Sequence, residues 1–267
     1  MRRRKVDRRR RGRPVGRTYP MKWVVVALAV TGVALIGGPY LFIALFLGSA
    51  PAKLHLPNVA TAAADPVAPG PVSGTWAVST GSQAGYRVHE YLFGQSHTAV
   101  GRTSQVSGEM VISGSEVTAA SFSVDMSSVK SDQAARDAQF RGYIMETYKY
   151  PHAMFVLAQP VSIGALPPVG QIVSLPASGE LTMRGVTRTV NFTLKAERLQ
   201  SGIDVDTAIP ITFSLWKIPS PNFAVARVGS SGTLEVLLHF VRADSKGRPL
   251  VPVKTVPTTT VFVPGTF

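Results

Sequence analysis

Between residues 74 and 242 the chain alternates apolar and polar positions with a period of two, the pattern of strands with one buried face. In the stretch TVNFTLKAE, for example, threonine, asparagine and lysine separate the apolar residues. About eight such segments, parted by short turn signals, fit between Trp76 and Arg242. This spacing predicts an antiparallel sandwich or barrel rather than βαβ units. The apolar phase of two of these strands consists of Phe122, Val124, Met126, Val190, Phe192 and Leu194.

One long interruption of this pattern, Arg136–Glu146, predicts a helix inserted between two strands. Ser131 is a candidate N-cap, because its hydroxyl can accept a bond from a free backbone N–H. Pro151 forces the residue before it into an extended conformation, so a strand resumes after it. Helical spacing of i, i+3, i+4 predicts an apolar stripe formed by Phe140, Tyr143 and Ile144.

The string LTMRGVT predicts a tight hairpin, because Gly185 accepts the positive φ that two-residue loops require. With Arg184-Gly185 as the loop, one face collects Leu181, Met183, Val186, Val190, Phe192 and Leu194. Arg188 falls on the same face, where an unpaired guanidinium is costly. Either a bulge or a carboxylate such as Glu180 or Asp137 relieves it, or it anchors a phosphate or quinone head group at a barrel mouth.

The N-terminus combines a basic block with an apolar run. Residues 1–22 hold eleven Lys/Arg and one acid, whereas residues 23–47 form a stretch of 25 residues without a charge. As a helix this stretch spans roughly 37 Å, enough for a hydrocarbon core of about 30 Å. The basic block alone could bind nucleic acid, but a basic run before such a segment favours a cytoplasmic tail and one transmembrane helix.

The remaining segments frame the strand-rich region. Residues 48–73 are rich in Pro and Ala and are typical of an extended linker. Small residues after the apolar run would allow signal-peptide cleavage, but that run exceeds the usual signal core of about 7–15 residues, which favours a retained anchor. We therefore expect a domain at 74–241 outside the cytoplasm, held at the cytoplasmic membrane, and a Pro/Thr-rich tail at 242–267.

Candidate chemistry is sparse. The chain has no cysteine, which excludes disulfides, thiolate metal sites and a cysteine nucleophile. Its five histidines show no metal-ligand spacing, and no nucleophile elbow or phosphate-binding glycine loop is present. Asp137 and Glu146 would point in different directions on a helix, so they do not form an acid/base pair. We expect no metal, no cofactor and no catalytic residue.

Three motifs resemble those of the YceI-like polyisoprenoid-binding family, in the family's order. The first is Arg136-Asp137 with the later Phe140, Ile144-Met145, Tyr150-Pro151 and Phe155; the others are GELTMRGVTRTVNF (Gly179–Phe192) and LWKIPSPNF (Leu215–Phe223). The resemblance spans about residues 74–241. Gln139 stands where many members have histidine, and the stretch before Tyr150 is about one residue short, which bears on head-group preference.

The resemblance implies an all-β fold: an eight-stranded antiparallel, lipocalin-like barrel with a short helical cap, holding a long isoprenoid chain in its interior. The implied function is binding of a polyisoprenoid or similar lipid. Combined with the N-terminal segments, this predicts a membrane-tethered binding protein, and we expect neither enzymatic activity nor a nucleic-acid partner. A barrel of this size can also be solid, which would make the chain a cell-envelope interaction protein. The candidate lipid-binding residues are Phe122, Val124, Met126, Phe140, Tyr143, Ile144, Met145, Phe155, Leu181, Met183, Arg188, Val190, Phe192, Leu194 and Trp216.

Overall fold

The structure, a computed structural model, describes residues 31, 50–56, 71–92, 94–222 and 226–244. The predicted cytoplasmic tail, the predicted transmembrane helix apart from Thr31, and the end of the chain lie outside the described residues. Within the described part, the structure contains no helix that combines the length and the hydrophobicity needed to cross a membrane.

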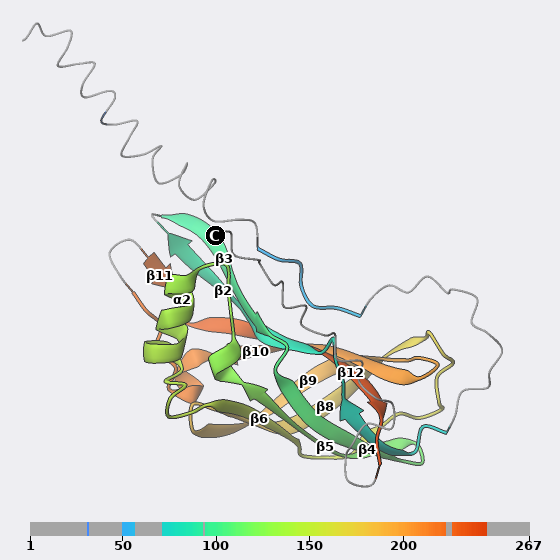
Figure 1. The fold of residues 1–267 in the computed structure, drawn as a ribbon. Helices are drawn as coiled ribbons and strands as arrows, with labels where there is room; N and C mark the ends of the chain where they lie inside the picture. Colours follow the sequence, from blue (N-terminus) through green and yellow to red (C-terminus); the bar gives the residue numbers. More distant parts are fainter. Residues whose placement is uncertain (1–30, 32–49, 57–70, 93, 223–225, 245–267) are drawn as a thin grey trace, which may run out of the picture. The chain divides into compact units, whose positions relative to one another are not determined.

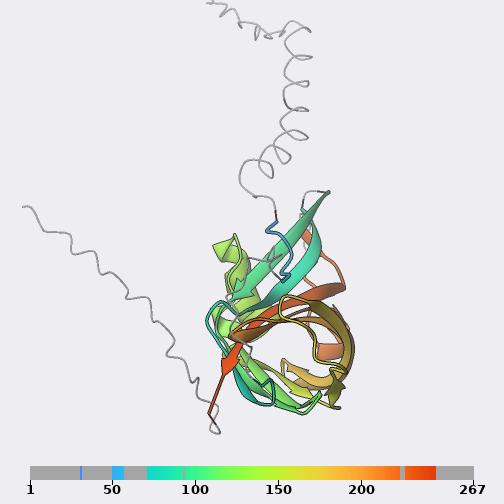
Figure 2. The same ribbon diagram turned by 90° about the vertical axis from the view of Figure 1, so that its right-hand side faces the viewer.

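Eight antiparallel strands close into a barrel (Figures 1 and 2), which confirms the expected all-β antiparallel barrel. Each strand is hydrogen-bonded to the next around the ring, and the last pairs with the first. In ring order the strands are β1 (Gly74–Val78), β4 (Val106–Ser113), β5 (Glu116–Asp125), β6 (His152–Leu157), β8 (Ile172–Met183), β9 (Val186–Arg198), β10 (Gly202–Thr212) and β12 (Ser231–Arg242).

Four further strands lie outside the ring. The hairpin of β2 (Gln83–Leu92) and β3 (Gln95–Thr103) extends the barrel wall at one end. It does so because β1 and β2 share one edge of β12: the β1 pairing ends at Val78↔Phe240, and the β2 pairing begins at Gln83↔Leu237. The two short strands are β7 (Val161–Ser162), which pairs with β5, and β11 (Ala226–Val228), which pairs with β2.

The β8–β9 hairpin has the two-residue loop that the sequence predicted. Met183 pairs with Val186, and the loop residues Arg184 and Gly185 have φ of 48° and 71°. Positive φ at both central positions is the requirement of a type I′ turn, whose twist matches that of the flanking strands. The turn fixes the register of both strands and with it the set of side chains that enter the barrel.

The predicted helical insertion is present as α2 (Ala134–Gln139), followed by one π-helical turn, η2 (Phe140–Ile144). Ser131 does not cap it: the N-cap is Gln133, which makes no side-chain cap bond. The backbone N–H and hydroxyl of Ser131 instead donate to Oδ1 of Asp137, at 2.8 and 2.7 Å. These bonds satisfy a carboxylate that is only 8% exposed and would otherwise be buried without partners.

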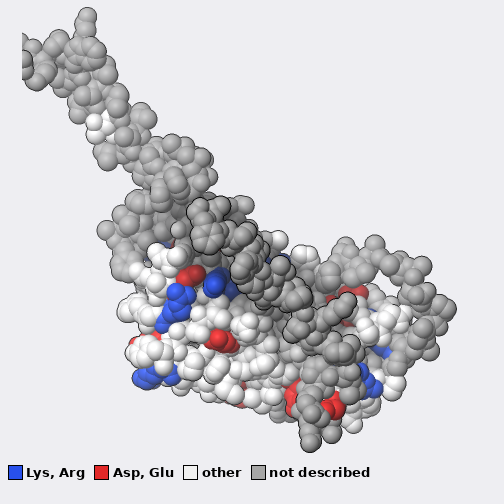
Figure 3. Space-filling model, in the orientation of Figure 1, with Lys and Arg blue, Asp and Glu red and all other residues white. Residues whose placement is uncertain are grey.

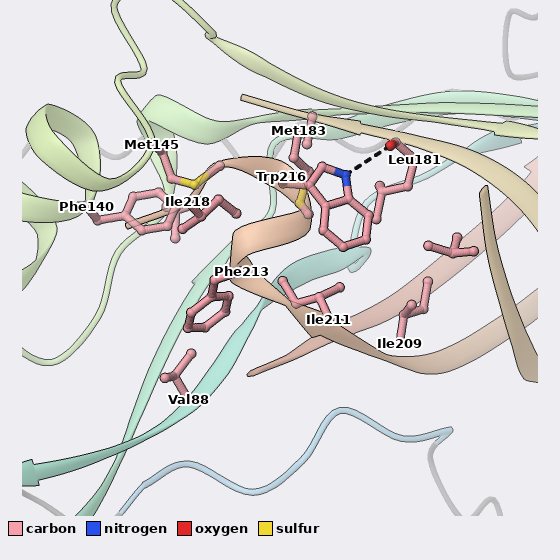
Figure 4. Packing of buried hydrophobic residues seen from close by; sticks show 13 residues of the cluster. Val88, Phe140, Met145, Leu181, Met183, Ile209, Ile211, Phe213, Trp216 and Ile218 are labelled. Atoms are coloured by element: carbon pink, nitrogen blue, oxygen red, sulfur yellow. Dashed lines mark hydrogen bonds between the residues drawn. The ribbon is translucent and has the colours of Figure 1, made fainter. Parts of the chain in front are cut away.

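Two hydrophobic clusters occupy the two ends of the barrel. The one at the α2 end includes Phe140, Met145 and the 3-10 helix η3 (Phe213–Trp216), which folds inward after β10. Figure 4 shows Trp216 in this cluster, its indole N–H donating to the carbonyl of Leu181 at 3.2 Å. The second cluster, at the other end, consists of Trp76, Met110, Ile112, Ile203, Leu238 and Phe240.

An ion-pair network crosses the outer face of the barrel. Glu235 on β12 is 2% exposed and accepts hydrogen bonds from Arg87 and from Arg102, the latter at 3.0 Å. Gly85 stands between Glu235 and Arg102 in the strand register, and a Cβ there would lie 2.9 Å from the Arg102 side chain. The missing side chain therefore lets Arg102 reach across β2. Burial alone would raise the pKa of Glu235, but its two arginine partners outweigh burial and lower it.

Part of the predicted linker packs against this network. Arg87 donates to the carbonyl of Pro51 at 2.7 Å, and Arg102 donates to that of Ala52. Leu56 is 5% exposed. The same two arginines thus bind a buried carboxylate and hold the segment that precedes the barrel.

The outer surface shows no single-signed charge patch on the face drawn in Figure 3. The described surface there is mainly uncharged, and basic side chains lie close to acidic ones. Charge on this face therefore offers no broad electrostatic footprint of the kind that nucleic-acid-binding proteins present.

Candidate functional site

The barrel encloses an apolar cavity of about 320 Å³, at the lower end of the range typical for small-molecule sites. Its wall comes from the inward side chains of seven ring strands, β4, β5, β6, β8, β9, β10 and β12, together with β2 and α2. On β10 the wall runs from Ile203 to Ile211 through every second residue. At about 3.3 Å per residue this distance is roughly 26 Å along the strand, so the cavity is elongated.

A row of aromatic rings shapes the middle of the cavity. Phe122 and Phe155 stack with their centroids 6.1 Å apart, and Phe192 meets Phe155 edge-on at 5.6 Å. Phe240 adds a tilted contact with Phe122 at 5.7 Å. Such pairs contribute about 0.5–1.5 kcal/mol each beyond area burial, so these rings hold one another in place and keep the space open.

The π-helical turn places two wall residues at the α2 end. The N–H of Met145 donates to the carbonyl of Phe140, five residues earlier, at 2.8 Å. Met145 is 3% exposed and Phe140 is 7% exposed, and both line the cavity. Phe140 stacks on Tyr86 of β2 with a centroid distance of 5.2 Å.

Polar groups in the wall at this end form a connected set. Arg136 of α2 donates to Oε1 of Glu90 on β2 at 2.7 Å, and it also pairs with Asp132. Both Glu90 and Arg136 line the cavity. His97 of β3 lies 4.0 Å from the same carboxylate oxygen of Glu90. Because Arg136 is shared between two carboxylates, it carries no unbalanced positive charge toward the cavity.

Tyr86 completes the α2 end. Its ring lies against Gly101 of β3, where a Cβ would come within 2.3 Å of the ring, and its other neighbour is Phe140. Burial raises the pKa of Tyr86 to about 12; Arg136 lowers it, and three nearby carboxylates raise it further. The hydroxyl therefore stays protonated at neutral pH and can donate a hydrogen bond.

The opposite end of the cavity also carries an acid and a base, Glu197 and Arg198 at the end of β9. Glu197 is 2% exposed, and its Oε2 has no hydrogen-bond partner in the described structure. Burial, followed by the charge of Asp204, raises the pKa of Glu197. The formal charges of Glu197 and Arg198 sum to zero.

Eleven of the fifteen candidate residues lie in the cavity wall. They come from β5, β6, β8 and β9 and from the segment that begins at Met126 and includes η2. These residues are Phe122, Val124, Met126, Phe140, Ile144, Met145, Phe155, Leu181, Met183, Phe192 and Leu194.

Three of the remaining candidates are placed differently. Tyr143 is 60% exposed, because the π-helical turn breaks the i, i+3, i+4 stripe and rotates this residue outward. Val190 and Trp216 are buried in the cluster at the α2 end but do not line the cavity. They form packing around η3, which occupies the barrel interior at that point.

Arg188, the fourth, does not contact the cavity. It is exposed, and its Nε donates to the carbonyl of Leu215 in η3 at 3.2 Å. Neither a bulge nor a carboxylate partner is needed: Glu180 accepts from Thr189, and Asp137 accepts from Ser131. Alternation places Arg188 on the same face of β9 as Val190 and Phe192. The sequence pattern does not show that the 3-10 helix η3 covers the end of that face and supplies a carbonyl to Arg188.

Sequence reasoning missed Tyr86 and Glu90. A signal for Glu90 was present: Ala84, Tyr86, Val88 and Glu90 occupy one phase of the β2 alternation, so the acid falls at an inward position. An acid at such a position indicates either a buried ion pair or a ligand contact.

Proteins of known structure share the fold. A search of curated protein sequences gave no significant match. Among solved structures, a polyisoprenoid binding domain from Saccharophagus degradans implicated in plant cell wall breakdown matches with a TM-score of 0.51 and 18% identity, over 63% of this chain and 98% of that one. BcnA from Burkholderia cenocepacia matches with a TM-score of 0.45 and 16% identity, over 59% of this chain and 96% of that one. The sequence profile of the YceI-like domain matches residues 76–240, and the chain therefore belongs to the YceI-like family.

Proposed function

We propose that this protein is a membrane-tethered, extracytoplasmic binding protein for a polyisoprenoid or a similar long-chain lipid. The observation that carries the proposal is the elongated apolar cavity enclosed by the barrel. An apolar cavity of this shape gains most from an apolar chain, because each buried methylene contributes about 0.8 kcal/mol. The polyisoprenoid binding domain from Saccharophagus degradans, with its similar fold, supports this ligand class.

A solid barrel, the basis of the alternative interaction-protein function, does not fit a cavity of about 320 Å³. Packed interiors have few voids larger than a water molecule. Catalysis gains no support from the wall either, since Arg136 and Glu90 are bonded to each other. Within the described residues, no three His, Asp or Glu side chains are grouped so as to hold a metal ion.

The tethered, extracytoplasmic placement rests on the sequence. A basic block at residues 1–22 precedes the uncharged run at 23–47, the arrangement that leaves the N-terminus in the cytoplasm. The barrel follows on the other side. A reporter active only in the cytoplasm, fused after residue 242, should then be silent, and the mature protein should keep residues 1–47. Strong reporter activity, or an N-terminus near residue 50, would contradict this part of the proposal.

The binding function is tested by native mass spectrometry of the purified full-length protein, followed by lipid extraction. We expect a bound species with an extended apolar chain, and we expect affinity to rise with chain length across a series of isoprenoid alcohols. The series separates chain recognition from adventitious detergent binding, because detergent occupancy would not follow isoprenoid length. A protein that binds no member of the series would overturn the proposal.

A further inference from the structure

The α2 end of the cavity brings three polar side chains to an otherwise apolar wall: Tyr86, Glu90 and Arg136. Oε1 of Glu90 accepts from Arg136, whereas its Oε2 accepts no hydrogen bond from any described residue. Tyr86 is held by ring contacts, and its hydroxyl likewise has no hydrogen-bond partner in the part of the chain that the structure describes. Among the described residues, this end therefore has one carboxylate oxygen and one hydroxyl without a hydrogen-bond partner on residues that line the cavity.

The electrostatic balance at this end is negative. The charges that act on Tyr86 are one guanidinium, Arg136, and three carboxylates, Asp137, Glu90 and Asp132. Their formal sum is −2, and it remains negative even if the nearby His97 is protonated. Arg136, the one cation in the set, is already bonded to Glu90 and Asp132.

This arrangement discriminates between classes of lipid head group. A phosphate carries a charge of about −1.5 to −2 at neutral pH and mainly accepts hydrogen bonds, so it would face carboxylates without a free cation. A hydroxyl or a primary amide is neutral and both donates and accepts. Such a head group can donate to Oε2 of Glu90 and accept from the hydroxyl of Tyr86.

We propose that the α2 end of the cavity is a head-group site that selects an uncharged donor–acceptor head, an alcohol or a primary amide, and that Glu90 excludes phosphorylated lipids. This inference rests on the proposed lipid-binding function. Glu90 and Tyr86 are its specificity-determining residues.

The test compares geranylgeraniol with geranylgeranyl monophosphate, which have the same chain, as ligands of the full-length protein in one detergent. The alcohol should bind at least about tenfold more tightly, since like charges brought together in a binding site cost several-fold to many-fold in affinity. Glu90→Gln should narrow this ratio by raising the affinity for the phosphate. Glu109→Gln removes the same charge from an exposed position on β4 and should leave the ratio unchanged.

A second variant keeps the test decisive if Glu90→Gln fails to fold. Tyr86→Phe retains the ring contact with Phe140 and should weaken alcohol binding roughly two- to tenfold, the value of one hydrogen bond. Tyr143→Phe, at an exposed position outside the cavity, is the matched control.

The outcomes are separable. Equal affinities for alcohol and phosphate, or tighter binding of the phosphate, would overturn the head-group inference and leave lipid binding intact. A Tyr86→Phe variant that binds the alcohol as tightly as the Tyr143→Phe control would also overturn it. Failure of both ligands to bind would overturn the proposed function itself, and the inference with it.

Discussion

Ala120 is a position at which a larger side chain would fill part of the cavity. It lies on β5, lines the cavity and faces Met110 across the strand pair. Replacement by phenylalanine adds a phenyl ring to the interior without removing any existing contact. If the space is the lipid site, Ala120→Phe should weaken lipid binding and leave the fold intact.

The size of the effect follows from the cavity. A phenyl ring takes up a substantial part of about 320 Å³, and we take it to displace about four methylenes of the bound chain. At about 0.8 kcal/mol each, the loss is about 3 kcal/mol, or roughly 100-fold in Kd. A bulky side chain forced into a packed core instead costs typically about 1–3 kcal/mol of stability. Since the ring enters empty space, the melting temperature should stay the same or rise.

Ala119→Phe is the matched control, because Ala119 is the preceding residue of β5 and is exposed on the outer face of the barrel. Both variants should be compared with the unmodified protein by thermal unfolding and by titration with geranylgeraniol. The reasoning is refuted if Ala120→Phe unfolds at a clearly lower temperature while binding is unchanged. That result would mean that the interior is filled and that the lipid binds elsewhere.

Three other perturbations test the remaining contacts. Glu235→Gln should cost about 3–5 kcal/mol of unfolding free energy in denaturant melts, because it removes the buried carboxylate that neutralises two partly buried arginines; a loss below 1 kcal/mol would contradict this. The bond to Asp204 outweighs burial and raises the pKa of His239. The stability that the His239–Asp204 pair contributes is therefore complete below about pH 6.5 and is lost as pH rises through the higher folded pKa. NMR titration should show the raised pKa of His239 disappearing in Asp204→Asn. Arg188→Met should weaken binding of an isoprenoid alcohol and of its phosphate to the same extent; selective loss of the phosphate would show a head-group role.

The barrel was predictable because its determinants are local. Alternation assigns each strand a buried face, and a positive-φ glycine at Gly185 fixes one hairpin, so the strand set follows from short windows of sequence. The family resemblance added the closure of the ring, which no local window contains. Closure depends on the pairing of Trp76 with Arg242, far apart in the chain.

The parts that could not be predicted depend on tertiary contacts. The same residues could form an α-helical stripe or a π-helical turn. The turn that forms has a bond from Met145 N–H to the Phe140 carbonyl and exposes Tyr143. It goes with the packing of Phe140 against Tyr86 and of Met145 inside the barrel, which are tertiary contacts. Trp216 reads as a cavity residue until η3 is seen to fold inward. For these elements, the sequence determines the candidates but not their orientation.

The pairing of β1 with β12 has a consequence for how the protein folds during its synthesis. Only three residue pairs, from Trp76↔Arg242 to Val78↔Phe240, join the first strand of the ring to the last. Contacts between such distant residues form late, because the loop-closure entropy must be overcome before they contribute. On the ribosome, the ring stays open until β12 has emerged, and β1 and β10 each lack a neighbour until then. Cargo can therefore be enclosed only after synthesis of the whole domain, and a nascent chain stalled before β12 exposes two unpaired strand edges to aggregation.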